Sequence, residues 1–527
     1  MRARQIRRDI RGIFSLGAIG AVGILGCTLP VVGDAAPGMQ CTVAAPQAKA
    51  PKDTTIAGAD VVAAADKAPE HCLVKGTVAT PGNTVDFQLA LPKEWNGKFL
   101  FQGVGGFAGQ MARLDTSLTR GYAAATTDTG HQGSSATDGS WALDNRPKEI
   151  DYGHRGTHVT TVAAKNLTAA YYGNVPRYAY FNGCSNGGRQ ALMEAQRYPQ
   201  DFNGIIAGDP SFGALGYVRR AITYEFMFAS PDRVLAPAKL EVLSKAVLAA
   251  CDKNDGVADG LIGDPRLCKF DPAPLQCKPG AEEDCLTAGQ VQMVKQIYGD
   301  ARTPQGDTLY GFPIGHEAGA TGWSLWITGK AAPVPQADGI LNFAAADAPI
   351  GYRFVDGFMR YMAFEKDDPA YDWRHFEMTH DLPKIKTITT ILSPTNADLQ
   401  PLQQGGSKLL LYHGWSDPAI SAYGTIDYYN KVVKAAGGKQ KADDFVRLFL
   451  VPGMHHCTGG PGPNAFDTLT AMEQWVEKGN APQVMIASHL TDGKVDRTRP
   501  LCAEPQVARY VGSGSIDQAE NFRCAGP

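Results

Sequence analysis

A serine flanked by glycines constrains the fold of this chain more than any other feature of its sequence. Residues 183–187 read G-C-S-N-G, after a stretch that predicts a strand at 177–181 and before one that predicts a helix at 187–197. A serine on so tight a turn takes a strained backbone, and flanking glycines let strand and helix approach closely. We interpret Ser185 as a nucleophile beside N–H groups that can stabilise an oxyanion. The alternative is a glycine-rich turn whose serine only caps a helix.

Two later strand-like runs end in residues that could complete the chemistry of Ser185. The run 408–412 leads into Asp417, and the run 446–451 leads into His455 and His456. A nucleophilic serine needs a general base, and the base needs an acid that orients it. Serine, acid and histidine follow in this chain order in α/β-hydrolases. Single aspartates after strands are usually caps, and loop histidines are usually surface residues. The joint order favours a triad, but spacing alone does not choose between the two histidines.

Strand-like and helix-like stretches alternate in two parts of the chain and are separated by a region without this alternation. The pattern predicts a mainly parallel sheet covered by helices, which is an α/β-hydrolase core with an inserted lid domain. A length of 527 residues also favours two structural units. The predicted parts are a signal peptide at 1–35, core halves at 36–209 and 396–527, and the lid at 210–395. Residues 36–70 are expected to be an irregular lead-in.

The N-terminus predicts export of the protein. Five arginines between residues 2 and 11 precede an apolar run at 13–25, and small residues suit cleavage near Ala36. The pair Arg7-Arg8 permits a twin-arginine route. An alternative places a lipid anchor on Cys27. The formal net charge is −3 without a clustered basic stretch, which argues against nucleic acid as a partner.

The cysteine count agrees with export, because removing Cys27 from the eleven cysteines leaves an even number. Two cysteines, Cys184 and Cys457, adjoin Ser185 and His456. If these two pair, their Cα atoms lie within about 7 Å of each other. Such a bridge would hold Ser185 beside His456, which favours His456 over His455 as the base. Local spacing suggests the other pairs: Cys41–Cys72, Cys251–Cys268, Cys277–Cys285 and Cys502–Cys524.

The order Cys-Ser, Asp, His-Cys resembles the tannase and feruloyl esterase family, whose members share a triad braced by a disulfide. The resemblance covers about residues 70–527. It includes E-H-C at 70–72, W-N-G at 95–97, G-G-R at 187–189, V-P-G-M-H-H-C at 451–457 and R-P-L-C at 499–502. By this resemblance, the backbone N–H groups of Gly106 and Asn186 would form the oxyanion hole.

A second motif, C-D-K-N-D-G-V-A-D-G-L at residues 251–261, lies in the predicted lid. Closely spaced carboxylates and glycines suit Ca²⁺, which takes several oxygen ligands. The alternative is a solvated acidic turn. The family resemblance implies a structural calcium ion within a loop that the Cys251–Cys268 bridge would close. Its side-chain ligands would be Asp252, Asp255 and Asp259, and its carbonyl ligands would be Val257 and Leu261.

The predicted function is hydrolysis of small aromatic esters of the hydroxybenzoate or hydroxycinnamate type. Aromatic residues of the lid could form a wall for a phenolic acyl group, although such residues are more often plain core. A terephthalate monoester hydrolase of the same family holds its substrate's carboxylate with a lid arginine. Residues 325–350 contain Lys330 but no arginine, which makes this substrate the alternative. Two further alternatives are a serine peptidase on the same fold and a catalytically silent, calcium-dependent binding protein.

Overall fold

The computed structural model describes residues 40–526 except residues 66, 338 and 340. Its centre is a nine-stranded sheet with the strand order β1-β2-β3-β5-β4-β6-β7-β12-β13. From β5 to β13 all neighbouring strands are parallel, whereas β1, β2, β3 and β5 pair antiparallel. The strands are β1 (Thr54–Val62), β2 (His71–Thr80), β3 (Asn83–Pro92), β4 (Lys98–Gln102), β5 (Ala123–Thr127), β6 (Tyr178–Cys184), β7 (Gly204–Gly208), β12 (Lys408–Gly414) and β13 (Val446–Val451).

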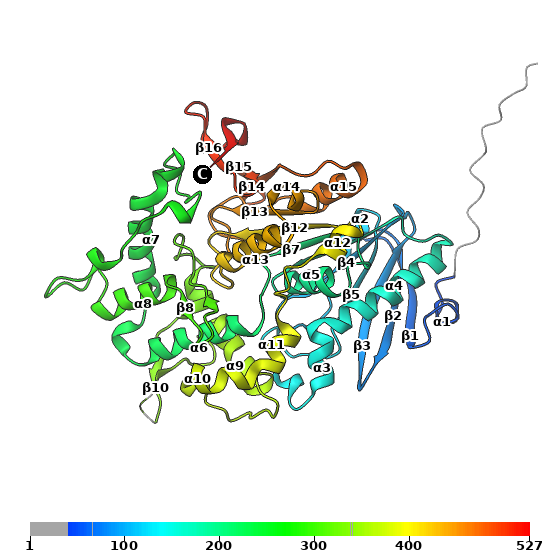
Figure 1. Ribbon diagram of the computed structural model, residues 1–527, viewed down its shortest axis with the longest axis horizontal. Helices are drawn as coiled ribbons and strands as arrows, with labels where there is room; N and C mark the ends of the chain where they lie inside the picture. The colour runs from blue at the N-terminus through cyan, green and yellow to red at the C-terminus, as the bar shows by residue number, and fades with distance from the viewer. Residues whose placement is uncertain (1–39, 66, 338, 340, 527) are drawn as a thin grey trace, which may run out of the picture. The chain divides into compact units, whose positions relative to one another are not determined.

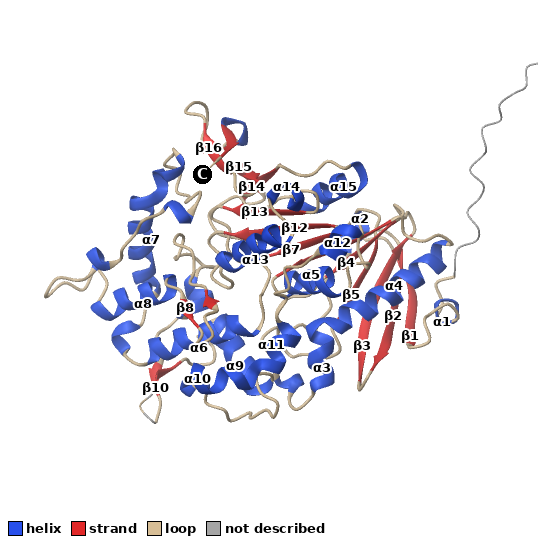
Figure 2. Ribbon diagram, viewed as in Figure 1, coloured by secondary structure: helices blue, strands red, loops and turns tan. Residues whose placement is uncertain are grey.

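Helices cover both faces of the parallel part, which explains why its strands are apolar on both sides (Figures 1 and 2). Phe181 and Leu409 pack against α4 (Gly156–Tyr172), α5 (Asn186–Arg197) and α13 (Ala422–Ala435). Their chain neighbours Tyr180 and Leu410 face the other way, toward Met472 and Trp475 of α15 (Thr468–Lys478). Successive side chains of a strand therefore point to opposite faces of the sheet, and both faces need apolar side chains because helices cover both.

The prediction that residues 36–70 are an irregular lead-in was wrong. They contain the short helix α1 (Ala44–Gln47) and the nine-residue edge strand β1 (Thr54–Val62). The sequence of β1 is rich in threonine, alanine, glycine and aspartate, and therefore shows no clear apolar alternation. Pairing with β2 and the Cys41–Cys72 disulfide hold this strand in place. These are tertiary interactions that a local pattern does not contain.

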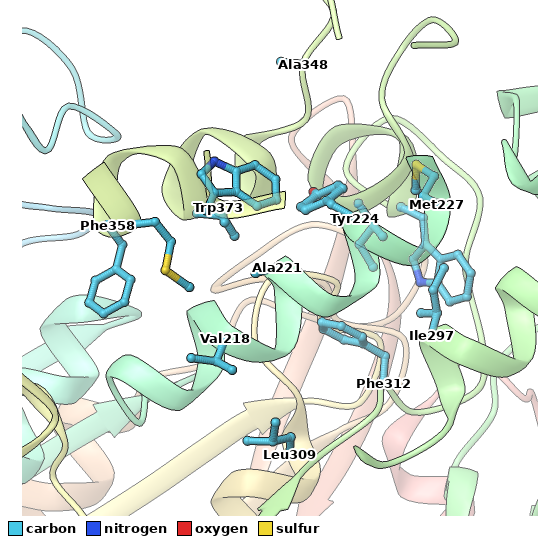
Figure 3. Packing of buried hydrophobic residues seen from close by; sticks show 14 of the residues in the cluster. Val218, Ala221, Tyr224, Met227, Ile297, Leu309, Phe312, Ala348, Phe358 and Trp373 are labelled. Carbon is cyan, nitrogen blue, oxygen red and sulfur yellow. The ribbon is translucent and has the colours of Figure 1, made fainter. Parts of the chain in front are cut away.

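Residues 210–395 are mostly helical, and Figure 1 shows their helices gathered on one side of the sheet. They pack around α6, whose side chains Val218, Ala221, Tyr224 and Met227 are buried (Figure 3). Residues 39–527 form one compact unit, so a separate lid domain stays a prediction. The helices are α6 (Ala214–Phe228), α7 (Pro237–Cys251), α8 (Ala288–Tyr298), α9 (Ile350–Tyr361), α10 (Met378–Asp381) and α11 (Lys386–Leu392), and the two-residue strands are β8 (Ala301–Arg302), β9 (Thr308–Leu309), β10 (Val334–Pro335) and β11 (Leu341–Asn342).

The remaining elements lie at the margins of the sheet or in the C-terminal segment. They are α2 (Asp115–Thr119), α3 (Arg146–Ile150), α12 (Gln400–Gln404), α14 (Lys439–Ala442) and the antiparallel pairs β14 (Val484–Thr491) with β15 (Lys494–Cys502) and β16 (Val507–Tyr510) with β17 (Phe522–Ala525). The predicted signal peptide and Cys27 lie outside the described residues. Within residues 40–526, apart from the three gaps, no helix is long and apolar enough to span a bilayer.

Candidate active site

Ser185 occupies the turn between β6 and α5 with a backbone that few residues adopt. Its φ is +64° and its ψ is −121°, which is a strained conformation for a residue with a side chain. Its N–H donates to Gly208 O of the neighbouring strand β7 over 2.9 Å. A Cβ atom on Gly183 would lie 2.5 Å from Gly187 O, so only glycine fits there. The turn is therefore as tight as the glycine-flanked motif predicts.

The structure brings Ser185, His456 and Asp417 into one hydrogen-bonded chain. Ser185 Oγ lies 2.8 Å from His456 Nε2, and His456 Nδ1 lies 2.8 Å from Asp417 Oδ2. Asp417 Oδ1 accepts the N–H groups of Ala419 and Ile420 at 2.7 and 3.0 Å. Burial alone would raise the pKa of Asp417, but the two imidazoles beside it hold that pKa well below its usual range. The acid therefore stays ionised and can orient His456 for proton transfer from the serine.

The disulfide between Cys184 and Cys457 lies directly beside this chain. Its Cα atoms are 6.0 Å apart, although 273 residues separate the two cysteines in the sequence. The other four bridges join the pairs that local spacing suggests. His455 turns away from the serine: its Nδ1 lies 2.6 Å from Thr321 Oγ1, and its Nε2 lies 3.2 Å from His316 O. His456, not His455, is thus the histidine in contact with Ser185.

Gly106 and Asn186 line the same cavity as Ser185 and His456. Gly106 has a φ of +60°, and a Cβ atom there would collide with Ala136 O, so the position requires glycine. Asn186 begins α5, and its side-chain Nδ2 donates to Val104 O over 2.9 Å. That bond ties the loop before Gly106 to the helix after the serine. Both backbone positions therefore border the place where an ester carbonyl would be attacked.

Two fully buried residues behind the triad were not identified by the sequence reasoning. His413 is the second-last residue of β12, and its Nε2 lies 3.2 Å from Asp417 Oδ2. Asp209 follows β7, and its Oδ1 accepts the Gly414 N–H over 2.8 Å. Polar side chains at the carboxyl ends of two buried apolar strands were the available signal. Their proximity depends on the pairing of β7 with β12, which no local pattern specifies.

A cavity of about 810 Å³ opens onto Ser185. Aromatic side chains from α6, α9 and the turn 324–328 contribute to its lining, namely Tyr217, Phe354 and Trp326. The Trp326 ring lies edge-on to the His456 ring, with centroids 4.9 Å apart. Three other aromatic residues of the segment 210–395, Trp323, Phe343 and Phe358, are buried in the core around α6. The lining also includes polar residues, among them Asp307, Thr308, Asp427 and Lys431.

The acidic loop 251–261 has the oxygen donors that calcium prefers. Two of its carboxylates, those of Asp252 and Asp259, contact other groups of the protein. Asp252 Oδ1 accepts the N–H groups of Asp259 and Gly260, both at 3.1 Å. The Asp259 carboxylate contacts Arg499. Among the residues that the structure describes, clusters of three potential ligand groups within 4.8 Å of one another occur elsewhere and do not include this loop.

Asp255 is the carboxylate of the loop with the strongest reason to bind a cation. Burial, together with the neighbouring carboxylates of Asp259 and Asp252, raises the pKa of Asp255 to about 6. The Cys251–Cys268 disulfide closes the segment, and Val257 and Leu261 are buried within it. Donor chemistry and charge crowding therefore fit a divalent cation, although Asp259 would have to exchange its contact with Arg499.

Comparison with known proteins identifies the family of the chain. The family model described as "Tannase and feruloyl esterase" matches residues 72–525. An uncharacterised esterase from Xanthomonas campestris is 36% identical over 87% of this chain and 85% of its own length. Mono(2-hydroxyethyl) terephthalate hydrolase from Piscinibacter sakaiensis is 33% identical over 89% and 87%. A probable feruloyl esterase from Arthroderma benhamiae is 34% identical over 84% and 82%.

Two solved structures have a similar fold. Feruloyl esterase B from Aspergillus oryzae superposes with a TM-score of 0.80 at 25% identity, over 91% of this chain and 100% of that structure. Tannin acyl hydrolase from Aspergillus niger shares the fold, with a TM-score of 0.70 at 20% identity over 93% and 96%. The expected α/β-hydrolase fold is confirmed. The chain belongs to the tannase and feruloyl esterase family and is a carboxylic ester hydrolase.

Proposed function

We propose that this chain is an exported serine esterase that hydrolyses aromatic carboxylic esters through an acyl-enzyme. The observation that carries the proposal is the hydrogen-bonded chain from Ser185 through His456 to Asp417, with both distances at 2.8 Å. These lengths are within the reach that a general base needs to remove a proton from a nucleophile. The cavity beside the serine gives an ester access to it.

Ser185 Oγ attacks the ester carbonyl carbon while His456 Nε2 accepts the hydroxyl proton. The carbonyl π electrons move to the oxygen, where the N–H groups of Gly106 and Asn186 stabilise the negative charge. The bond to the alcohol oxygen then breaks, and His456 returns the proton to the leaving alcohol. Water attacks the acyl-enzyme by the same path in reverse and releases the acid. Asp417 holds the neutral imidazole in the tautomer that accepts at Nε2, and it stabilises the imidazolium that forms after the proton transfer.

The aromatic lining formed by Tyr217, Trp326 and Phe354 supports an aromatic acyl group. A free carboxylate on that group would need a donor that is not already occupied. Arg220 lines the cavity, but its guanidinium donates to the carbonyls of Trp326, Pro418 and Ala419. We therefore favour hydroxybenzoate and hydroxycinnamate esters over terephthalate monoesters. The similarity to the terephthalate hydrolase keeps the latter as the second candidate.

A turnover panel of methyl gallate, methyl ferulate, chlorogenate and mono(2-hydroxyethyl) terephthalate separates these substrates. We expect kcat/KM for at least one of the first three to exceed that for the terephthalate monoester. The reverse order would replace our first candidate by the second. Turnover of a peptide amide but of no ester would indicate a peptidase, and no turnover of any compound would leave a silent binding protein.

We further propose a structural calcium ion in the loop 251–261 and export of the mature chain. The crowded carboxylates of Asp252, Asp255 and Asp259 support the ion, with Val257 and Leu261 as carbonyl donors. Five disulfides support an oxidising compartment. The mass of the mature protein distinguishes a released protein from a lipid-anchored one. Cleavage near Ala36 gives an unmodified N-terminus, whereas the alternative leaves a lipidated Cys27.

A further inference from the structure

His413 is a buried histidine that the proposed triad leaves without a role. It is the second-last residue of β12, four residues before Asp417, and its side chain is fully buried. It does not line the substrate cavity, so it is not placed to touch an ester. Burying an imidazole among charged groups is unfavourable unless its hydrogen bonds are satisfied. The contacts of its two ring nitrogens therefore bear on its function.

The Nε2 atom of His413 faces three oxygen atoms. It lies 2.9 Å from Ile420 O, 3.2 Å from Asp417 Oδ2 and 3.6 Å from Asp209 Oδ1. A carbonyl and two carboxylates accept but do not donate, so Nε2 has to carry a hydrogen. The Nδ1 atom lies 2.7 Å from the hydroxyl of Thr425, which can donate or accept. The ring can therefore be neutral or positively charged without an unsatisfied nitrogen.

Asp417 receives hydrogen bonds on both of its oxygens. Oδ2 lies within reach of two imidazoles, His456 Nδ1 at 2.8 Å and His413 Nε2 at 3.2 Å. Oδ1 accepts the two backbone N–H groups of Ala419 and Ile420. The acid is thus fixed from behind by His413 and from the side by its own loop. The orientation of His456 depends on how firmly this carboxylate is held.

The charges around His413 favour its protonated form. Burial alone would lower its pKa, but the carboxylates of Asp209 and Asp417 outweigh burial and raise it. Asp209 lies at the end of β7, and burial raises its own pKa to about 7, against the effect of His413. Thr425 is the neighbour from α13 and is uncharged. Arg220 of α6 acts on Asp417 from the cavity side.

We propose that His413 is a positioning residue of the reaction: its Nε2–H group donates to Ile420 O and lies against Asp417 Oδ2, with Asp209 beside it. This inference rests on the proposed triad. It gives the esterase a second acid–histidine pair behind the first one. The pair holds the acid of the triad in place and offsets part of its negative charge.

The consequence for the pH profile has a definite sign. A positive charge on His413 beside Asp417 repels the positive charge that His456 gains when it accepts a proton. Removing the charge from His413 removes this repulsion. As the pH is lowered, the enzyme then loses activity at a higher pH than the wild type does, because the base must be unprotonated to accept the serine proton. The acid limb of kcat/KM against pH therefore moves upward when His413 is neutralised.

The test compares His413→Gln, His413→Leu and Asp209→Asn in the full-length protein. Glutamine keeps a neutral N–H donor near the position of Nε2, whereas leucine has no donor. We expect kcat to fall about 10-fold in His413→Gln and about 100-fold in His413→Leu, with KM changed less than about threefold. The acid limb moves upward by about 0.5–1 unit in His413→Gln, and moves less in Asp209→Asn, because that variant also removes a negative charge that interacts with His456.

His455→Gln is the matched control, because His455 is an equally buried histidine that bonds Thr321 and His316 and not the triad. It should lower Tm without moving the acid limb. An unchanged pH profile in both His413→Gln and Asp209→Asn, or an equal shift in His455→Gln, would overturn the proposal. Should His413→Leu fail to fold, the profile of His413→Gln decides alone. Ser185→Ala in the same assay separates this outcome from a failure of the triad, because activity close to that of the wild type there would exclude the triad itself.

Discussion

Cys184 and Cys457 are 273 residues apart in the chain, yet their Cα atoms lie 6.0 Å apart beside Ser185 and His456. One cysteine ends β6 and the other follows β13, so the bridge joins the two halves of the core across the helical segment 210–395. A covalent link at this point limits how far the nucleophile and its base can separate. The first prediction concerns this link.

We predict that Cys184→Ala/Cys457→Ala loses activity more severely than it loses secondary structure. A bridge closing so long a loop should contribute about 4–5 kcal/mol to stability in the chain-entropy model, although measured values are often smaller. Without it, Ser185 and His456 can drift out of hydrogen-bond reach. Circular dichroism and kcat measured on the same sample provide the comparison.

The control is Cys502→Ala/Cys524→Ala, which removes a bridge with a Cα separation of 5.7 Å in the C-terminal segment. This variant should lose stability but retain most of its kcat. Peptide mapping of the non-reduced protein tests the pairing directly. A free thiol at Cys184, or any partner other than Cys457, would contradict the structure.

Ser185→Ala should abolish covalent labelling by a fluorophosphonate probe and lower kcat by several orders of magnitude. The variant should retain the fold. Alanine has a Cβ atom like serine, so the substitution adds no strain to the unusual backbone conformation at this position. In-gel fluorescence of wild type and variant gives the result. Equal labelling of both proteins would place the nucleophile elsewhere.

Removal of calcium should lower the melting temperature of the protein. A ligand that binds only the folded state stabilises it by mass action, and the crowded carboxylates around Asp255 would lose their counter-charge. Tm is measured after chelation and after return of Ca²⁺, with Asp255→Asn alongside. The variant should be insensitive to both treatments. If the wild type melts at one temperature under all conditions, the loop is only an acidic turn.

Glu194→Gln should stabilise the protein, and more so at pH 8 than at pH 5. Glu194 is fully buried beside Asp201, and neither of its oxygens meets a hydrogen-bond donor among the described residues. Burial first, and the Asp201 carboxylate second, raise its pKa well above its usual range. The folded state therefore holds a proton that the unfolded state releases above about pH 4.5. The cost of this protonation grows with pH, and glutamine removes it.

Glu473→Gln provides a control of opposite sign. Hydrogen bonds from Lys98 and Tyr122 outweigh burial and lower the pKa of Glu473, so its ionised form stabilises the folded state. That contribution is present above the unfolded pKa and is lost as pH falls through the folded one. Because pH 5 and pH 8 both lie above the unfolded pKa of about 4.5, urea unfolding should show that Glu473→Gln loses stability by nearly the same amount at the two pH values. The same trend in both variants would contradict the assignment for Glu194.

The sequence alone predicted the class of the chain, which is confirmed, and the three residues that the structure places in one hydrogen-bonded chain. The strand, the glycines around Ser185 and the helix after it are contiguous, so their physical signature is local. Asp417 and His456 each follow an apolar strand that is recognisable by itself. The adjoining cysteines added a long-range constraint that is still readable in one dimension, and it distinguished His456 from His455.

Only the tertiary structure decided which residues support the reactive ones. Strand β1 has a weak pattern of its own and depends on pairing with β2. Asp209 and His413 meet because β7 and β12 are neighbours in the sheet, despite 203 intervening residues between Asp209 and His413 that include the helical segment. The aromatic residues of that segment divide between cavity and core according to helix packing. Burial and side-chain contacts depend on how distant segments of the chain pack together, and local sequence patterns do not specify that packing.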